Sequence, residues 1–255
     1  MTATPAGITY ADYLKLNQLL SAQQPLSSLH DEMLFIVIHQ TKELWMKQML
    51  HELELAIRLI DEDSFAPAYK ALARVGRIQS VMTLSWDVLA TLTPVDYLAF
   101  RDVLGTSSGF QSAQFRALEY QFGLKDPAYL AHYAEGSEER ELLQAALDRP
   151  SLRDGAIAAL ERAGFVLGDQ SVEALAAGWL QVYRDTDRWF DLYQLAEKLV
   201  DIDDALAMWR HKHVLTVERI IGSKRGTGGS SGASYLRSTL DKRIFPELWA
   251  LRTDL

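Results

Sequence analysis

Apolar residues recur along most of this chain at intervals of three and four, and no convincing run alternates apolar with polar β-branched residues. This spacing is typical of amphipathic helices, so we predict an all-α protein. Proline, glycine and short polar stretches separate the expected helices. These helices are expected at 8–22, 31–61, 65–92, 94 to near 105, 110–122, 171–200 and 203–221, and a last segment follows at 233–252.

The segment 31–61 is the strongest helix prediction. Its apolar residues form one stripe, and Phe35, His39, Lys42 and Met46 lie beside that stripe. A helix that is apolar on several sides is expected at the centre of a bundle. The stripe consists of Leu34, Ile38, Trp45, Met49, Leu53, Ile57 and Ile60.

Residues 123–170 have a different character from the long helices. Asp126-Pro127, Gly136-Ser137, Arg149-Pro150 and Gly164 interrupt short Ala-rich and Glu-rich pieces there. Such breakers predict small surface helices inserted in the main bundle. With this insertion, residues 1–255 are expected to form a single helical domain.

Composition narrows the class of protein. Of 255 residues, 48% are hydrophobic and 24% are charged, as in ordinary globular chains. The net charge is −8 without a Lys/Arg-rich run, so nucleic acid is not an expected partner. The strongly apolar run 33–38 is too short to span a membrane, and residues 1–7 lack a secretory signal. We therefore expect a cytoplasmic protein without a membrane partner.

The chain contains no cysteine, which excludes disulfides, thiolate zinc sites, iron–sulfur clusters and thiolate-ligated haem. A metal centre here must use histidine, methionine, tyrosine or carboxylate ligands. The candidate imidazoles are His30, His39, His51, His132, His211 and His213.

His213 is expected to face the core of the bundle. On a helix His211 points about 200° away from it and falls beside Glu218 on the solvent side, so the two imidazoles cannot easily share a metal. His213 is either a core histidine satisfied by a hydrogen bond or the ligand of a metal or haem. It shares a stripe with Leu206, Trp209, Val217 and Ile220.

His39 follows Phe35 by one turn on the most apolar helix, and the same two interpretations apply to it. Two inward imidazoles on different core helices favour the ligand interpretation, because helical bundles commonly hold haem between histidine-bearing helices.

Two glycine-rich loops are candidates for small-molecule binding. The loop 226–232 is either a flexible linker or a segment whose backbone approaches a ligand while Thr227, Ser230 and Ser231 supply hydroxyls. Arg101 lies one turn before the similar loop 105–109, where it either clamps a carboxylate or forms a surface ion pair. No P-loop, dinucleotide-binding or hydrolase motif is present.

Five segments between residues 10 and 232 form a specific combination. They are Tyr10-Ala11-Asp12-Tyr13-Leu14, residues 30–40 from His30 to His39-Gln40, Phe100-Arg101 with Ser108-Gly109-Phe110-Gln111-Ser112, Trp209-Arg210 with His213, and Gly226–Gly232. Together they resemble the tryptophan 2,3-dioxygenase family and lie in that family's order, so the resemblance covers nearly the whole chain.

The resemblance implies an all-helical homotetramer that binds haem b, takes L-tryptophan and O2, and opens the indole C2–C3 bond to give N-formylkynurenine in the kynurenine pathway. His213 would be the axial ligand of the haem iron, and Ser108 and Gly109 would lie against the haem. An N-terminal segment would complete the substrate site of a neighbouring subunit. Its contacting residues would be Tyr10, Tyr13 and Leu14.

The same resemblance assigns roles around the substrate. His39 would hydrogen-bond the indole N–H, and Phe35 would pack on the indole ring. Arg101 would hold the carboxylate, Thr227 would contact the carboxylate and ammonium groups, and Tyr97 would line the same pocket.

Three positions depart from the family pattern. Lys42 stands in place of an aromatic residue, Ile38 in place of a small hydroxyl residue, and His211 at a position that is often aromatic or basic. Lys42 and Ile38 lie close to His39 on the predicted helix 31–61, so these two departures leave the choice of substrate open. Two alternatives therefore accompany the dioxygenase: a haem monooxygenase that forms an oxindole from a tryptophan derivative, and a non-enzymatic haem sensor. A sensor has no need of a carboxylate clamp.

Overall fold

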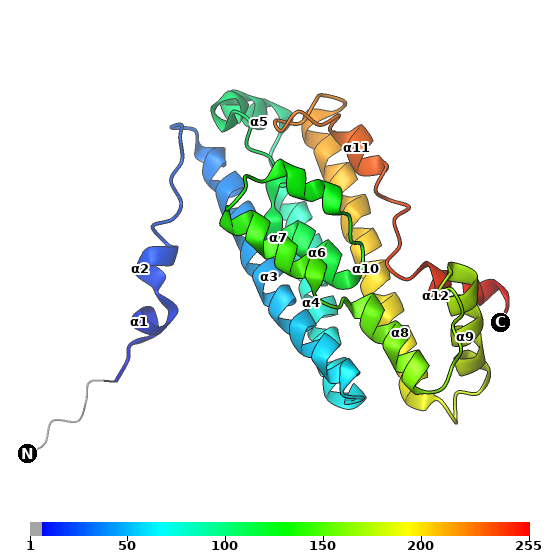
Figure 1. Ribbon diagram of the computed structural model, residues 1–255. Helices are drawn as coiled ribbons and strands as arrows, with labels where there is room; N and C mark the ends of the chain where they lie inside the picture. Colours follow the sequence, from blue (N-terminus) through cyan, green and yellow to red (C-terminus); the bar gives the residue numbers. More distant parts are fainter. Residues whose placement is uncertain (1–6) are drawn as a thin grey trace, which may run out of the picture.

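The computed structural model describes residues 7–255, and all regular structure among them is helical (Figure 1), which confirms the all-α prediction. The α-helices are α1 (Tyr10–Leu14), α2 (Leu16–Leu19), α3 (His30–Asp61), α4 (Phe65–Leu89), α5 (Pro94–Phe100), α6 (Ala113–Phe122), α7 (Glu138–Asp148), α8 (Leu152–Arg162), α9 (Val172–Arg184), α10 (Phe190–Ile221), α11 (Ala233–Arg237) and α12 (Pro246–Ala250). Short 3₁₀ segments span Arg101–Leu104, Gly109–Gln111, Pro127–His132 and Leu251–Thr253.

Three long helices form the centre of the molecule. Helix α4 packs along α3 on one side and along α10 on the other, and α6 covers α3 (Figure 1). Leu53, Leu72 and Leu199, one from each long helix, are almost fully buried. Burial of such side chains is the main favourable contribution to folding. The bundle thereby fixes the relative positions of the cavity-lining faces of α3, α4 and α10.

The buried face of α3 differs from the expected stripe. Trp45 is 40% exposed, whereas Met46 and Lys42 are each only 5% exposed. On a helix with 3.6 residues per turn, Lys42 lies about 40° around the axis from Ile38 and about 60° from Trp45, so a buried face centred near Lys42 leaves Trp45 on its flank. Steps of four place Lys42 and Met46 on the buried face instead, so a charged residue type lies where an apolar one was expected.

The C-terminal half contains one long helix where two were expected. Helix α10 runs through residues 200–203 without a break, and the interruption falls earlier, between α9 and α10. Asp203, which lies at the expected break, is buried; its carboxylate accepts hydrogen bonds from the backbone N–H of Ile244 (3.1 Å) and from Trp249 Nε1 (2.9 Å). Its polar group is satisfied by the C-terminal segment, so it does not end the helix.

The region 123–170 is helical as expected, but it is not confined to the surface. Helix α8 contributes Leu152 and Leu160 to the main core, both fully buried. Helix α7 contributes Leu143 to a smaller cluster with Tyr120 of α6. The sequence pattern here is short and interrupted, so it conceals burial that arises from contacts with α3 and α6.

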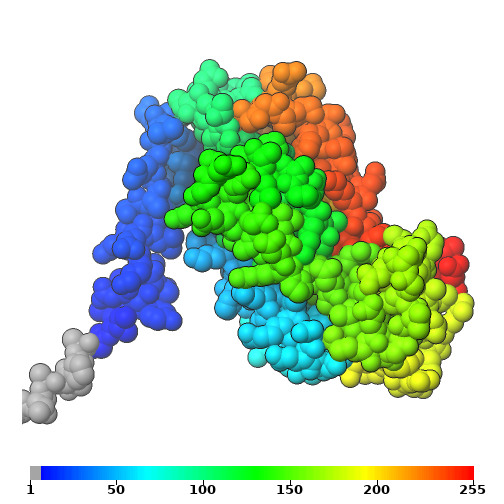
Figure 2. Space-filling model, in the orientation of Figure 1, coloured from blue at the N-terminus to red at the C-terminus, as the bar shows by residue number. Residues whose placement is uncertain are grey.

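The N-terminal segment extends away from the bundle (Figures 1 and 2). It is not one helix over 8–22, because Lys15 adopts a left-handed conformation with φ of 52° between α1 and α2. Tyr10 and Tyr13 are more than two-thirds exposed. No helix in the described part of the chain combines the length and apolarity needed to cross a membrane.

Candidate functional site

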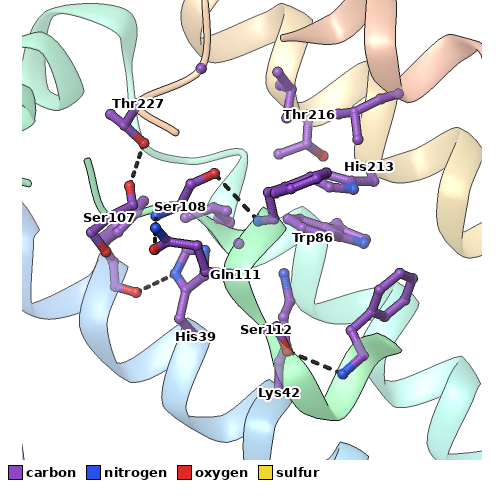
Figure 3. Close-up of a pocket in the computed structure, with 18 of the residues that line it drawn as sticks. His39, Lys42, Trp86, Ser107, Ser108, Gln111, Ser112, His213, Thr216 and Thr227 are labelled. Carbon is purple, nitrogen blue, oxygen red and sulfur yellow. Dashed lines mark hydrogen bonds between the residues drawn. The ribbon is translucent and has the colours of Figure 1, made fainter. Parts of the chain in front are cut away.

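A cavity of about 730 Å³ opens between α3, α4 and α10 and the loops before α6 and after α10. That volume lies in the range of pockets for cofactors and small molecules. The walls include Phe35, Trp86 and Trp209, while hydroxyl groups of both loops line the rim. Figure 3 shows side chains from all these elements converging on this space.

His213 lines this cavity from α10, as its stripe predicts. Its ring stacks on the indole of Trp86, with centroids 4.3 Å apart and planes 10° apart, and Trp209 packs at an angle 5.2 Å away. The His213 ring makes no hydrogen bond within residues 7–255. The alternative in which His213 is a core histidine satisfied by a hydrogen bond is therefore not observed. Burial lowers its pKa to about 3, so the imidazole is neutral at pH 7.

His39 lies on α3 and lines the same cavity. Its Nδ1 donates a hydrogen bond to the Phe35 carbonyl oxygen at 2.7 Å, because a carbonyl can only accept. Burial lowers the pKa of His39 to about 4, so the ring is neutral and carries a single N–H. Because Nδ1 carries that proton, Nε2 is the hydrogen-bond acceptor. The ring of Phe35 lies 4.2 Å from that of His39 and 5.8 Å from that of Tyr97. These three side chains form one aromatic wall.

The two glycine-rich loops are packed together rather than acting as free linkers. A Cβ atom added at Gly228 would lie 2.6 Å from Cβ of Ser108, so only glycine permits this approach. The Thr227 hydroxyl donates to the carbonyl oxygen of Ser107 (Figure 3). Thr227, Ser108 and Gly109 all line the cavity.

Arg101 connects the end of α5 to the second loop. Its guanidinium donates to the carbonyl oxygen of Arg225, and no carboxylate pairs with it in the part of the chain that the structure describes. The ion-pair alternative is therefore not observed. The side chain does not line the cavity itself, but it holds the loop that carries Thr227 at the cavity rim.

His211 points away from the cavity and is exposed, as expected. Its Nδ1 donates to the carbonyl oxygen of Ala207 at 2.9 Å. Tyr10, Tyr13 and Leu14 also lie outside the cavity, on the extended N-terminal segment.

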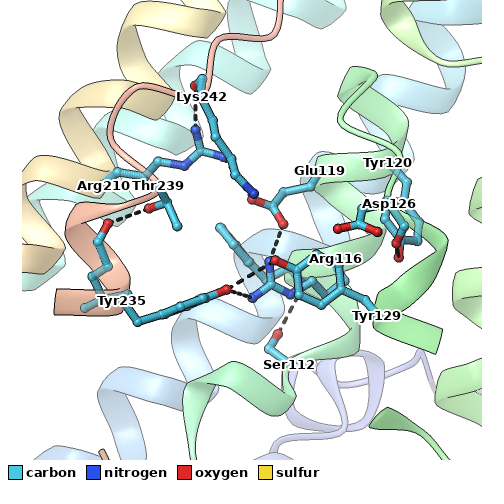
Figure 4. Close-up of polar contacts among 12 residues, drawn as sticks. Ser112, Arg116, Glu119, Tyr120, Asp126, Tyr129, Arg210, Tyr235, Thr239 and Lys242 are labelled. Atoms are coloured by element: carbon cyan, nitrogen blue, oxygen red, sulfur yellow. Dashed lines mark hydrogen bonds and ion pairs between the residues drawn. The ribbon is translucent and has the colours of Figure 1, made fainter. Parts of the chain in front are cut away.

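Sequence reasoning missed a polar cluster at one end of the cavity (Figure 4). Arg116 Nη1 donates to Glu119 Oε2 at 2.5 Å, and Arg210 Nη2 donates to Glu119 Oε1 at 2.9 Å. Arg116 Nη2 also donates to the hydroxyl of Tyr235 at 3.5 Å, and Tyr235 lies 3.2 Å from the hydroxyl of Tyr129. With two guanidinium groups and one carboxylate, this end keeps one net positive charge.

The sequence signal for this cluster was weak. Arg116 and Glu119 have the spacing of an ordinary helix-surface ion pair, and Arg210 was noted only as a neighbour of Trp209. Only the fold shows that these side chains are buried at 7% exposure or less and face the cavity.

Comparison with known protein families agrees with this geometry. The family model described as Tryptophan 2,3-dioxygenase matches residues 1–172 and 166–255, which together span the chain. The chain belongs to the tryptophan 2,3-dioxygenase family. Tryptophan 2,3-dioxygenase of Caulobacter vibrioides is 62% identical to it over 259 residues, covering 97% of this chain and 98% of the relative. A Bacillus cereus protein of that name is 54% identical (97% and 93% covered), and that of Polaromonas naphthalenivorans is 50% identical (97% and 92% covered).

The cavity of this family member has the features that haem requires. A single neutral imidazole without a hydrogen bond would suit a haem iron, because the porphyrin supplies the remaining nitrogen ligands and the protein needs to provide only one. The aromatic walls suit the macrocycle, and the positive end suits its carboxylates. Nε1 of Trp209 and Nε of Arg116 are buried donors without a partner among the described residues, as expected of groups that bind a further acceptor.

Proposed function

We propose that this protein is a haem-dependent dioxygenase that inserts both atoms of O2 across the C2–C3 bond of the L-tryptophan indole ring to give N-formylkynurenine. The observation that carries this proposal is the pair of neutral imidazoles, His213 and His39, that face one cavity from opposite helices. Membership of the tryptophan 2,3-dioxygenase family supports it.

Several residues would hold the cofactor. His213 would ligate the iron, and Ser108 and Gly109 would lie against the macrocycle. Arg116 and the indole N–H of Trp209 would bind the carboxylates at the positive end of the cavity. Haem held by these residues would supply an iron centre for the reaction with O2.

The remaining residues would bind and orient tryptophan. Phe35 and Tyr97 present an aromatic wall to the indole ring, and His39 Nε2 is free to accept its N–H. Arg101 would turn from the Arg225 carbonyl to the substrate carboxylate, beside the Thr227 hydroxyl. Indole is electron-rich at C3, so orientation and exclusion of water are the main tasks of these residues.

We also propose a homotetramer in which the N-terminal segment completes the site of a neighbouring subunit. Tyr10 and Tyr13 expose 75% and 71% of their surface, a large apolar area for a segment that extends from the bundle. Such a segment suits an exchanged arm better than a free end.

Product analysis tests the proposed reaction. The purified haem protein is reduced without oxygen, mixed with L-tryptophan and then exposed to ¹⁸O2, and the product mass is measured. We expect N-formylkynurenine with two labelled oxygen atoms and its near-ultraviolet absorption. An oxindole with one labelled atom would identify a monooxygenase, and unconsumed tryptophan would support a sensor.

Replacing His39 with alanine is expected to lower kcat/KM for tryptophan about tenfold, the effect of losing one hydrogen bond to the indole N–H. Tryptophan methylated at the indole nitrogen cannot donate this bond, so its kcat/KM should change much less. The matched control is His51→Ala, an exposed position on the same helix. Equal losses for both substrates, or none for tryptophan, would contradict the role assigned to His39.

A further inference from the structure

Lys42 is a buried amine without a partner. It lies on α3 one turn after His39, is 5% exposed and lines the cavity. Its Nζ has no hydrogen bond or ion pair with any residue that the structure describes. Lysines rarely bury the amine in this way, because the stem normally carries the charged group out to water.

The Lys42 amine is the outer member of a three-layer stack. Its Nζ lies 2.8 Å from the ring centroid of Trp86, and Trp86 lies parallel to His213 at 4.3 Å (Figure 3). The stack thus connects α3 to α10 through one indole ring of α4. We call these three side chains, Lys42, Trp86 and His213, the amine–indole–imidazole stack.

The His213 ring is contacted by aromatic rings, with Trp86 stacked on its face and Trp209 packed at an angle. Metal-binding imidazoles are usually oriented by a hydrogen bond from the second ring nitrogen. His39 and His211, which are not proposed as metal ligands, each make such a bond to a backbone carbonyl oxygen. His213 has no such bond within the described residues, and Trp86 Nε1 also has no partner there. The Trp86 and His213 rings are therefore positioned by stacking of their faces rather than by hydrogen bonds. The Lys42 amine adds a cation–π attraction on the other face of the Trp86 indole.

The charge of Lys42 reaches both histidines. After burial, its positive charge is the next cause that lowers the pKa of His213, and it contributes to the lowered pKa of His39. Burial lowers the pKa of Lys42 itself to about 6. The cavity that Lys42 lines also contains His39, Glu32 and Glu43 (α3), Trp86 (α4), Tyr97 (α5), the buried Arg116–Glu119 pair (α6) and His213 with Arg210 (α10). Within residues 7–255, no carboxylate lies within ion-pair distance of the Lys42 amine.

We propose that Lys42 is a positioning residue that orients and polarises the His213 imidazole through the indole of Trp86 and thereby raises the reduction potential of iron bound there. While it is protonated, the amine places a positive charge near the site, and this charge opposes the additional charge of the oxidised iron and so favours the ferrous form. The inference rests on the proposed haem site and adds Lys42 as a residue that controls the reduction potential of the iron.

Lys42→Met tests this inference, because methionine has a similar length without the amine. At pH 5.5, where the amine is mostly protonated, the ferrous-to-ferric ratio at a fixed applied potential should fall about tenfold, equivalent to about 59 mV for one electron. The iron–imidazole stretching frequency of the ferrous protein should also shift. Lys47→Met, an exposed lysine on the same helix, should leave both quantities unchanged.

Two further arms separate charge from packing. Wild type and Lys42→Met should converge at pH 8, where the wild-type amine is largely neutral. Lys42→Arg keeps a charge at both pH values and should retain a high potential at both. If Lys42→Met fails to fold, Lys42→Arg still tests the inference, because its potential should stay high at pH 8 while that of the wild type falls between pH 5.5 and 8.

Failure of this inference differs from failure of the proposed function. A wild-type protein that does not retain haem would overturn the proposed function. A haem-loaded Lys42→Met protein with the wild-type potential and stretching frequency, or a wild-type potential independent of pH across this interval, would overturn the inference about Lys42 and leave the haem site in place.

Discussion

Alanine in place of His213 should leave a folded helical protein that no longer retains haem. The imidazole is the ligand proposed for the iron, and its ring has no hydrogen bond to the described chain that would be lost on truncation. The measurement is the Soret absorption after incubation with hemin and desalting, with circular dichroism as the test of folding. We expect the Soret band to fall to the background of non-specifically bound hemin.

The matched control for His213 is two residues away. His211 is exposed and bonded to the Ala207 carbonyl, so His211→Ala should retain the full Soret band. Free imidazole should partly restore haem binding to His213→Ala, because the removed ring leaves space in the cavity. A normal Soret band in His213→Ala without added imidazole would refute the ligand assignment.

Substituting Arg101 by alanine is expected to raise KM for tryptophan roughly ten- to a hundredfold while haem is retained. Hydrogen bonds to a charged group contribute about 1.5–3 kcal/mol, which corresponds to this range. Lysine at this position keeps the charge but loses the two-pronged geometry, so Arg101→Lys should recover only part of the binding. Steady-state kinetics and the Soret band measure the two quantities separately.

A second substrate distinguishes a carboxylate clamp from a loop anchor. Arg101 also holds the loop that carries Thr227 through the Arg225 carbonyl, so truncation could act by loosening the loop. Tryptamine lacks the carboxylate, and its weaker binding should hardly change if Arg101 acts as a clamp. An equal loss of tryptophan and tryptamine binding would show that the role of Arg101 is structural, and an unchanged KM for tryptophan would exclude both roles.

Periodicity predicted the long helices because burial of one face imposes a spacing of three and four on the sequence. It was least reliable where that spacing was short or interrupted. The burial of one face of α8 was missed, and α10 was divided at residues 200–203, although the helix is continuous there. A sequence pattern records which residue types alternate, whereas burial of a particular polar side chain depends on partners far along the chain.

The features of the candidate site also fall into two groups, those that the sequence predicted and those that required the fold. The inward direction of His213 and the outward direction of His211 follow from helical geometry alone, and the local sequence also marked His39 and both glycine-rich loops. The packing of those loops against each other, the direction of Arg101 toward Arg225 and the burial of Arg116 required the fold. Each of these contacts joins segments that are distant along the chain.

By itself, the sequence determined the helical class, the inward imidazoles and the residues that resemble a known family, because these depend on local spacing and on residue identity. Only the tertiary structure decided that Lys42 is buried against Trp86, that Trp86 stacks on His213, and that the N-terminal segment lies away from the cavity of its own chain. The physical reason is that contacts between helices are set by the packing of whole faces, and a one-residue shift in that packing exchanges a solvent-facing side chain for a buried one.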